Sequence, residues 1–177
     1  MPLTRISQWY QDIFGTLQHW LQPLLLLLLR LLIARVFILS GLTKWNGWFD
    51  FNTDKYDLFL YEFFCPDPIR PGALLLCDPH TLDYNDGSWV IGLIKGLAVF
   101  TGIAELLLPL LLIAGLFSRV AALALMVMVG FIQLAVFPEW GHWWNPAAWW
   151  VAVLAVIVIF GPGRLALDRW LGLEKRA

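Results

Sequence analysis

Three charged residues in or beside long apolar runs, Arg35, Lys44 and Glu105, are the side chains in this sequence most able to carry chemistry. Arg35 and Glu105 lie near the centres of two such runs, and Lys44 follows the end of the first. A lone charge at the centre of a membrane costs at least about 2.5–3.5 kcal/mol, and such residues usually face a partner or a ligand. The sequence therefore predicts an Arg35–Glu105 pair, and all three residues are candidates for a buried polar or ligand-binding site.

Two interpretations of this polar site stay open. One is a structural ion pair that fixes helix register, and the other is a proton-linked or ligand-binding site. Pro109 favours a pocket, because a helical proline leaves the carbonyl four residues earlier, that of Glu105, without its donor. Lys44 fits either a side chain that reaches to the membrane surface or an outer polar ring that receives a head group.

The two cysteines, Cys65 and Cys77, form a second candidate pair and stand 12 positions apart. They fall in a segment that we expect outside the cytoplasm, where disulfides form readily. A bridge there would contribute roughly 3 kcal/mol in the chain-entropy model. The spacing is not C-x-x-C, the motif of thiol exchange, so a structural bridge is favoured over a redox-active pair or free thiols.

The histidines give no sign of a metal centre. His19, His80 and His142 are isolated in the sequence, whereas metal sites normally show clustered ligands. The sequence also shows no haem ligand pair, phosphate-binding loop, dinucleotide turn or catalytic triad. We therefore expect no metal and no covalently bound cofactor.

The elements that must position these residues are membrane-spanning helices. Of 177 residues, 60% are apolar and 14% charged, against about 45–50% and about 25% in soluble domains. The net charge of −1 gives no sign of nucleic-acid binding, and many of the 11 Trp lie near ends of apolar runs, as in an interfacial belt. Runs near the 20 residues that a span needs cover Leu24–Leu42, Val90–Leu116, Val120–Phe137 and, shorter, Ala147–Phe160.

The predicted fold is an all-α, polytopic membrane four-helix bundle with an N-terminal interfacial helix and a long outer first loop. Residues 1–22 form an amphipathic helix on the cytoplasmic surface, residues 23–163 hold the four spans with the outer loop at 45–89, and residues 164–177 are a cytoplasmic tail. Basic residues follow the second and fourth spans, which places both termini in the cytoplasm. These are Arg119, Arg164, Arg169, Lys175 and Arg176.

Three stretches resemble the DoxX/DoxD-type family of integral membrane proteins. The first span carries Ala34-Arg35-Val36-Phe37-Ile38-Leu39-Ser40-Gly41-Leu42-Thr43-Lys44, similar to the family pattern that ends in Ser-Gly-Leu-x-Lys. The second span carries Ala104-Glu105-Leu106-Leu107-Leu108-Pro109, followed by Gly115-Leu116-Phe117-Ser118-Arg119. The last ends in Gly161-Pro162-Gly163-Arg164-Leu165-Ala166-Leu167-Asp168. The resemblance spans about residues 25–170, although the acidic two-cysteine insert differs from the family's short first loop.

The resemblance implies a bacterial inner-membrane subunit or accessory protein of a redox system that is linked to quinone. Quinone is then the expected ligand, and a membrane or periplasmic protein and a second copy of the chain are expected partners. Any enzymatic role is that of a subunit, since the sequence lacks ligand sets for flavin, haem or iron–sulfur clusters. The alternative is a non-catalytic assembly or interaction module. A small-solute carrier is less favoured, because no inverted repeat is apparent.

Overall fold

The computed structural model describes residues 2–47, 49–85 and 87–174, and it is mostly helical. Among these residues, four helices are long and apolar enough to cross a membrane, which makes this a multi-pass membrane protein. They are α1 (Pro2–Leu42), α3 (Trp89–Ala114), α4 (Ser118–Phe131) with its π-helical continuation η2 (Ile132–Val136), and the helix that ends in α6 (Ala148–Phe160). The four predicted spans are confirmed as helices. The first helix begins much earlier than predicted, at Pro2, and the fourth span begins at Trp140, whereas the other ends lie within two residues of the prediction.

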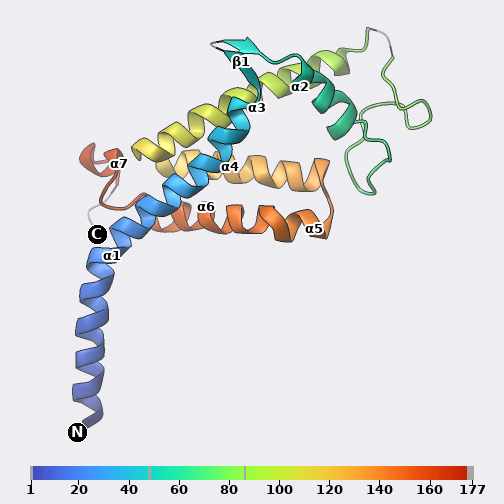
Figure 1. Ribbon diagram of the computed structural model, residues 1–177. Coiled ribbons are helices and arrows are strands. Elements are labelled where there is room, and N and C mark those ends of the chain that lie inside the picture. Colours follow the sequence, from blue (N-terminus) through green and yellow to red (C-terminus); the bar gives the residue numbers. More distant parts are fainter. Residues whose placement is uncertain (1, 48, 86, 175–177) are drawn as a thin grey trace.

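The four helices form a ring of neighbours. Helix α1 packs on α3 and α6, and α4 packs on the same two helices from the other side. The short turn after α3 returns the chain directly into α4, so these two helices run antiparallel (Figure 1). The core is apolar and draws on every helix of the ring, through Ile33, Phe37, Leu112, Leu125, Val129, Leu154 and Ile157.

The buried face of α1 follows helical periodicity and includes two charges. Its buried positions within the bundle recur mostly every three or four residues, as expected for one face of a helix: Leu26, Arg30, Ile33, Ala34, Phe37 and Gly41, and Lys44 continues this spacing two residues after the helix ends. Helix α3 has a matching face at Ile94, Ala98, Gly102, Glu105, Pro109 and Leu112. The two faces pack together, so the charges on them are enclosed between the helices.

Helix α1 is one continuous helix of 41 residues with Pro23 inside it. The sequence predicted a surface helix over residues 1–22 and a separate span, and the structure joins them. At about 1.5 Å per residue α1 is roughly twice the thickness of a hydrocarbon core. Its N-terminal half accordingly stands away from the bundle (Figure 1). That this half lies along a membrane surface stays a prediction.

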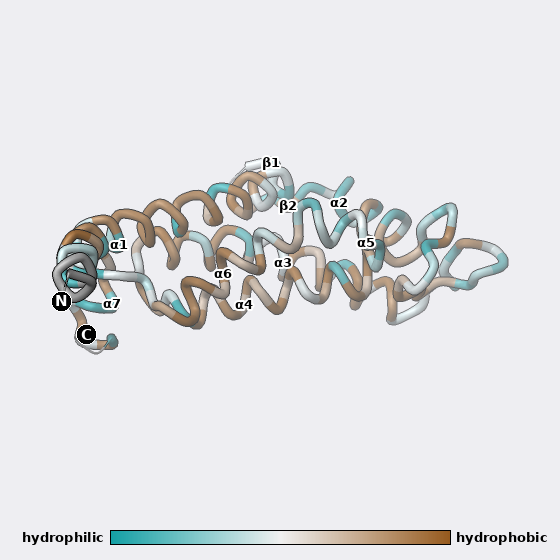
Figure 2. The backbone as a smooth tube through the Cα atoms, turned by 90° about the horizontal axis from the view of Figure 1, so that it is seen from below, coloured by the Kyte–Doolittle hydropathy of each residue, from teal (hydrophilic) through white to brown (hydrophobic). Residues whose placement is uncertain are grey.

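Residues 45–88, which we call the disulfide lobe, form small elements at one end of the bundle. They include the hairpin β1 (Trp45–Gly47) and β2 (Asp50–Phe51), helix α2 (Asp54–Asp57) and the π-helix η1 (Leu58–Phe63). The lobe packs against α3 through a core of Phe59, Leu60, Phe64, Ile94 and Ala98. Figure 2 shows its loops as the more hydrophilic end of a tube whose helices are largely hydrophobic.

The connection from α4 to α6 lies at the same end as the disulfide lobe. It contains α5 (Trp140–His142) and η3 (Trp143–Ala147), and the helical path is interrupted at Asn145, which has φ −149° and ψ 102°. This break explains why the sequence pattern predicted the fourth span from Ala147 only, one residue before α6 begins.

The opposite end of the bundle, which we call the arginine end, is closed by the chain after α6. Gly161 and Gly163 have φ of +76° and +83°, which glycine adopts without the strain of a side chain. They turn the chain back under the bundle into α7 (Leu167–Trp170). The predicted tail is therefore partly a structured closing segment, while Lys175 and Arg176 lie outside the described residues.

Candidate functional site

The Lys44–Glu105 pair is the polar centre between α1 and α3. Lys44 Nζ lies 2.5 Å from Glu105 Oε2, and the two residues are only 7% and 6% exposed. Ser40 Oγ accepts a second hydrogen bond from Lys44 Nζ at 3.3 Å. Each charge thus compensates the other in a place where either one alone would be costly.

Close contact between the two helices makes this pair possible. An ideal Cβ on Gly41 would lie 2.9 Å from Leu106 Cδ2 and 3.1 Å from Glu105 Cβ. Glycine therefore allows the backbone of α1 to approach α3 at this level. One turn further along α3, Pro109 is also buried and has no N–H to donate to the carbonyl of Glu105.

Arg35 lies elsewhere, and the predicted Arg35–Glu105 pair is wrong. Arg35 is exposed on the outside of the bundle, off the buried face that carries Lys44. The prediction assumed that the centres of both spans lie at one depth. Instead, the last turn of α1 packs against the middle of α3, because α3 continues outward to carry the disulfide lobe. Lys44, expected at a helix end near the surface, takes the place assigned to Arg35.

An aromatic wall stands beside the ion pair. The rings of Trp45 and Phe51 meet edge to face with centroids 5.4 Å apart, and Phe51 stacks obliquely on Tyr56 at 4.9 Å. Gly102 makes room for them, since its ideal Cβ would lie 3.2 Å from Phe51 Cε2. The indole nitrogen of Trp45 is buried without a hydrogen-bond partner among the described residues. Buried donors are normally satisfied, so this N–H is a candidate contact for a ligand.

A second polar centre, which the sequence prediction missed, ties the arginine end together. Arg30 is fully buried and donates hydrogen bonds to the carbonyls of Leu112, at 3.4 Å, and Leu165, at 2.5 Å. Its place on the buried face of α1, at helical spacing from Ile33 and Phe37, was the signal that could have identified it.

Asp168 completes this centre from the C-terminal segment. Its carboxylate accepts hydrogen bonds from the backbone N–H of Phe117, at 2.7 Å, and of Ser118, at 2.8 Å. These are among the N–H groups that a helix start leaves unpaired, so Asp168 caps α4. Its own N–H bonds to the Gly115 carbonyl at 2.8 Å.

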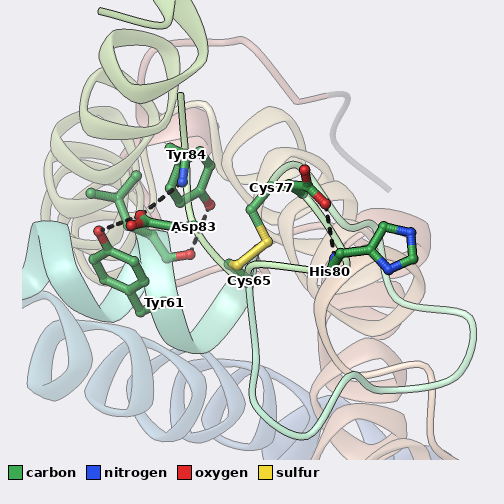
Figure 3. The surroundings of a disulfide bond; sticks show 8 residues. Tyr61, Cys65, Cys77, His80, Asp83 and Tyr84 are labelled. Carbon is green, nitrogen blue, oxygen red and sulfur yellow. Dashed lines mark hydrogen bonds between the residues drawn. A yellow bond between two sulfur atoms is a disulfide. The ribbon is translucent and has the colours of Figure 1, made fainter. Parts of the chain in front are cut away.

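The disulfide Cys65–Cys77 is confirmed, with the two Cα atoms 5.6 Å apart (Figure 3). Cys65 is buried, and a hydrogen bond from Leu76 N to the Phe64 carbonyl, 2.9 Å long, runs beside the bridge. The bridge therefore holds the loop back against the end of η1.

Two tyrosines brace the same loop. Tyr61 Oη donates to Asp83 Oδ1 at 3.3 Å, and Tyr84 Oη donates to the Leu60 carbonyl at 2.8 Å (Figure 3). Burial and the neighbouring Tyr61 raise the pKa of Tyr84 to about 12. Burial, followed by the charge of Asp83, also raises the pKa of Tyr61. His80 takes part only through its backbone N–H, which bonds to Asp78.

His142 lies in a network that borders the disulfide lobe, because Phe137 contacts Phe63 of the lobe. Its Nδ1 is 2.6 Å from Gln133 Oε1, and its ring stacks on Phe137. Beside this network, a cavity of about 360 Å³ is lined largely by Gln133, Leu134, Trp140 and Trp143. No group of three or more His, Cys, Asp or Glu residues in the described part of the chain is arranged to hold a metal ion.

The comparison with known proteins finds a similar protein, but it assigns no activity to that protein. An uncharacterized protein of Haemophilus influenzae is 26% identical over 150 residues, which cover 81% of this chain and 80% of the relative. No family model matches the chain. No solved structure matches it either.

Proposed function

We propose that this chain is a DoxX-like membrane subunit of a quinone-linked redox system and that it binds a quinone head group beside Lys44 and Glu105. The observation that carries the proposal is the indole N–H of Trp45, which is buried next to the Lys44–Glu105 pair and has no hydrogen-bond partner among the residues that the structure describes. A quinone ring offers a flat face for the aromatic wall and carbonyl oxygens for two donors, Trp45 Nε1 and Lys44 Nζ.

The proposal gives this chain only the binding and proton-handling part of the reaction. Glu105 can hold a proton near the head group, and Lys44 stabilises negative charge there. The proposal assigns electron delivery to a partner subunit. It requires the β1–β2 hairpin to shift, because the indole nitrogen of Trp45 is covered in this structure.

The test is to extract quinone from protein purified in mild detergent and to measure it per mole of protein by chromatography. Trp45→Phe removes the N–H while it keeps an aromatic ring, so we expect it to lower bound quinone roughly tenfold, about the value of one hydrogen bond to a buried acceptor. Trp170→Phe, at an 84% exposed position, is the matched control and should change nothing. The proposal is refuted if the wild-type protein carries no quinone. It is also refuted if Trp45→Phe and Trp170→Phe lower the amount of bound quinone equally.

A non-catalytic assembly module is the second candidate. It is favoured by the closed Lys44–Glu105–Ser40 arrangement, which needs no ligand, and by the disulfide-bridged lobe, which offers a rigid surface to a partner. The same purification separates the two functions. Partner chains that co-purify in stoichiometric amount without any quinone would support the module.

The proposed location is the bacterial inner membrane, with the arginine end and both termini in the cytoplasm. Four arginines, Arg30, Arg119, Arg164 and Arg169, gather at that end, and Lys and Arg typically flank the cytoplasmic side of membrane spans. A reporter fused after Ala177 should be active only in the cytoplasm. Periplasmic activity of the fusion would reverse the orientation.

A further inference from the structure

A cavity of about 520 Å³ lies at the arginine end, between the N-terminal half of α1 and the segment that follows α6. Its polar lining includes Gln18, His19, Gln22, Arg119, Arg164 and Arg169. Its apolar lining includes Pro23, Leu26 and Phe160. The cavity therefore joins a basic, hydrogen-bonding part to a hydrophobic part.

One of the three arginines is already neutralised. Arg119 Nε and Nη2 face the two carboxylate oxygens of Glu174 at 2.5 and 3.2 Å. Its remaining nitrogen, Nη1, bonds to the carbonyls of Val158 and Ile159 at the end of α6. Among the described residues that line the cavity, Glu174 is the one that carries a carboxylate, and it is paired with Arg119. Arg119 therefore forms part of the cavity wall, and the described lining holds no further carboxylate for Arg164 and Arg169.

The guanidinium of Arg164 contacts the imidazole of His19, whereas a guanidinium ordinarily contacts an anion. Its Nη1 lies 2.9 Å from His19 Nε2 and its Nη2 lies 3.1 Å from His19 Nδ1. A neutral imidazole has one N–H and one acceptor nitrogen, so only one of these contacts can be a hydrogen bond. Within the described residues, the positive charge of Arg164 therefore has no negative partner, and at most one of its two contacts with His19 is a hydrogen bond.

Arg169 adds a second such charge. Its side chain has no hydrogen-bond or ion-pair partner within the part of the chain that the structure describes, and the residue is half-buried against the same cavity. Two cations, an imidazole and two amides that share one hollow match an anion with several oxygen acceptors. A phosphate group has this chemistry, and planar guanidinium groups bind it in bidentate fashion.

We propose that this cavity binds the phosphate group of an anionic phospholipid, with Arg164 and Arg169 as its main ligands. The lipid is favoured over free phosphate because the cavity continues onto an apolar surface. Phe160, which lines the cavity, is 63% exposed, so an acyl chain can lie on it. The inference is independent of quinone binding, since none of its residues belongs to the Lys44–Glu105 site.

The test is a thermal-stability titration of the full-length protein in mild detergent. The probes are short-chain phosphatidylglycerol, short-chain phosphatidylcholine and inorganic phosphate, each at the same ionic strength. We expect phosphatidylglycerol to raise Tm at concentrations where the other two do not. Arg164→Gln should raise the Kd for phosphatidylglycerol at least roughly tenfold, as expected for the loss of charge-assisted hydrogen bonds.

Lys95→Gln is the matched control, because it removes one positive charge from an exposed position near the other end of α3. It should leave the Kd unchanged. Equal weakening by Lys95→Gln and Arg164→Gln would overturn the site and indicate a general charge effect. An equal rise of Tm with inorganic phosphate would overturn the lipid as the source, and no rise with any probe would overturn the proposal as a whole.

Discussion

Lys44 Nζ and Glu105 Oε2 form an ion pair enclosed between α1 and α3, 61 residues apart in the chain. The pair links the last residues before the disulfide lobe to the middle of the next span. It therefore couples the position of the β1–β2 hairpin to the register of the two helices. Its energetic role can be measured separately from any ligand.

A double-mutant cycle on Lys44→Gln and Glu105→Gln should show strong coupling. Each single variant leaves one buried charge alone, which costs about 3–5 kcal/mol. The double variant should be clearly less destabilised than the two single effects added together. Thermal or denaturant unfolding in detergent measures this, with Arg35→Gln and Glu105→Gln as the control cycle, which should be additive. Additivity of the Lys44–Glu105 cycle would contradict the observed pair. A folded double variant that has lost function would place the pair in the functional site.

Gly115→Ala should destabilise the protein by about 2–5 kcal/mol, from left-handed strain and overpacking together. Gly115 has φ +71°, and a Cβ there would lie 2.3 Å from Arg30 Nη1 and 2.6 Å from Ala166 Cβ. Gly92→Ala is the control, since its Cβ would meet nothing within 4 Å. In a helix interior this change should be neutral or stabilise by about 0.5–1 kcal/mol. Similar loss of unfolding temperature in both variants would show that the Arg30 contact is not the cause.

The disulfide should block labelling of both cysteines by thiol-reactive mass tags until a reductant is added. Cys65→Ser with Cys77→Ser should lower stability by roughly 3 kcal/mol, because the open loop gains entropy in the unfolded chain. A structural bridge leaves cellular function partly intact in this variant, whereas a redox-active pair loses it fully. Immediate labelling of both residues in fresh membranes would contradict the bridge.

Tyr84 should ionise at about pH 12, well above an ordinary tyrosine, because burial and then the neighbouring Tyr61 raise the pKa of its hydroxyl. Folding thus binds the Tyr84 proton more tightly, so its contribution to stability is complete below about pH 10 and is lost as the pH rises through 12. Ultraviolet titration of tyrosinate measures it, and Tyr84→Phe should remove the late-titrating group. If Tyr84→Phe instead removes a tyrosine that ionises near pH 10, the hydroxyl of Tyr84 is exposed to solvent.

The sequence predicted the helices better than their relative depth. Leu42 ends α1 and Phe160 ends α6 as predicted, because long apolar runs and a Gly-Pro-Gly stop are local signals. The partner of Glu105 depends on how far α3 extends outward to carry the disulfide lobe, and no local pattern encodes that. Arg30 and Lys44 fall at helical spacing on the buried face of α1 and its continuation, whereas Arg35 does not.

The disulfide could be predicted from the expected compartment and from the position of both cysteines in one loop. The structure around the disulfide could not be predicted in this way. The π-helical turns at η1, η2 and η3 depend on tertiary contacts, such as the bond from Leu74 N to the Ala135 carbonyl. Likewise, nothing near Asp168 in the sequence marks it as the cap of α4, because the N–H groups that it serves are 50 and 51 residues earlier.

That cap has a consequence for biogenesis. Translation delivers Asp168 only after α4 and α6 have been synthesised, so the start of α4 must enter the membrane with the N–H groups of Phe117 and Ser118 uncapped. The same late segment brings the Leu165 carbonyl to Arg30 of the first span. A chain released before residue 165 therefore holds the four helices without the contact that joins the first of them to the segment after the last.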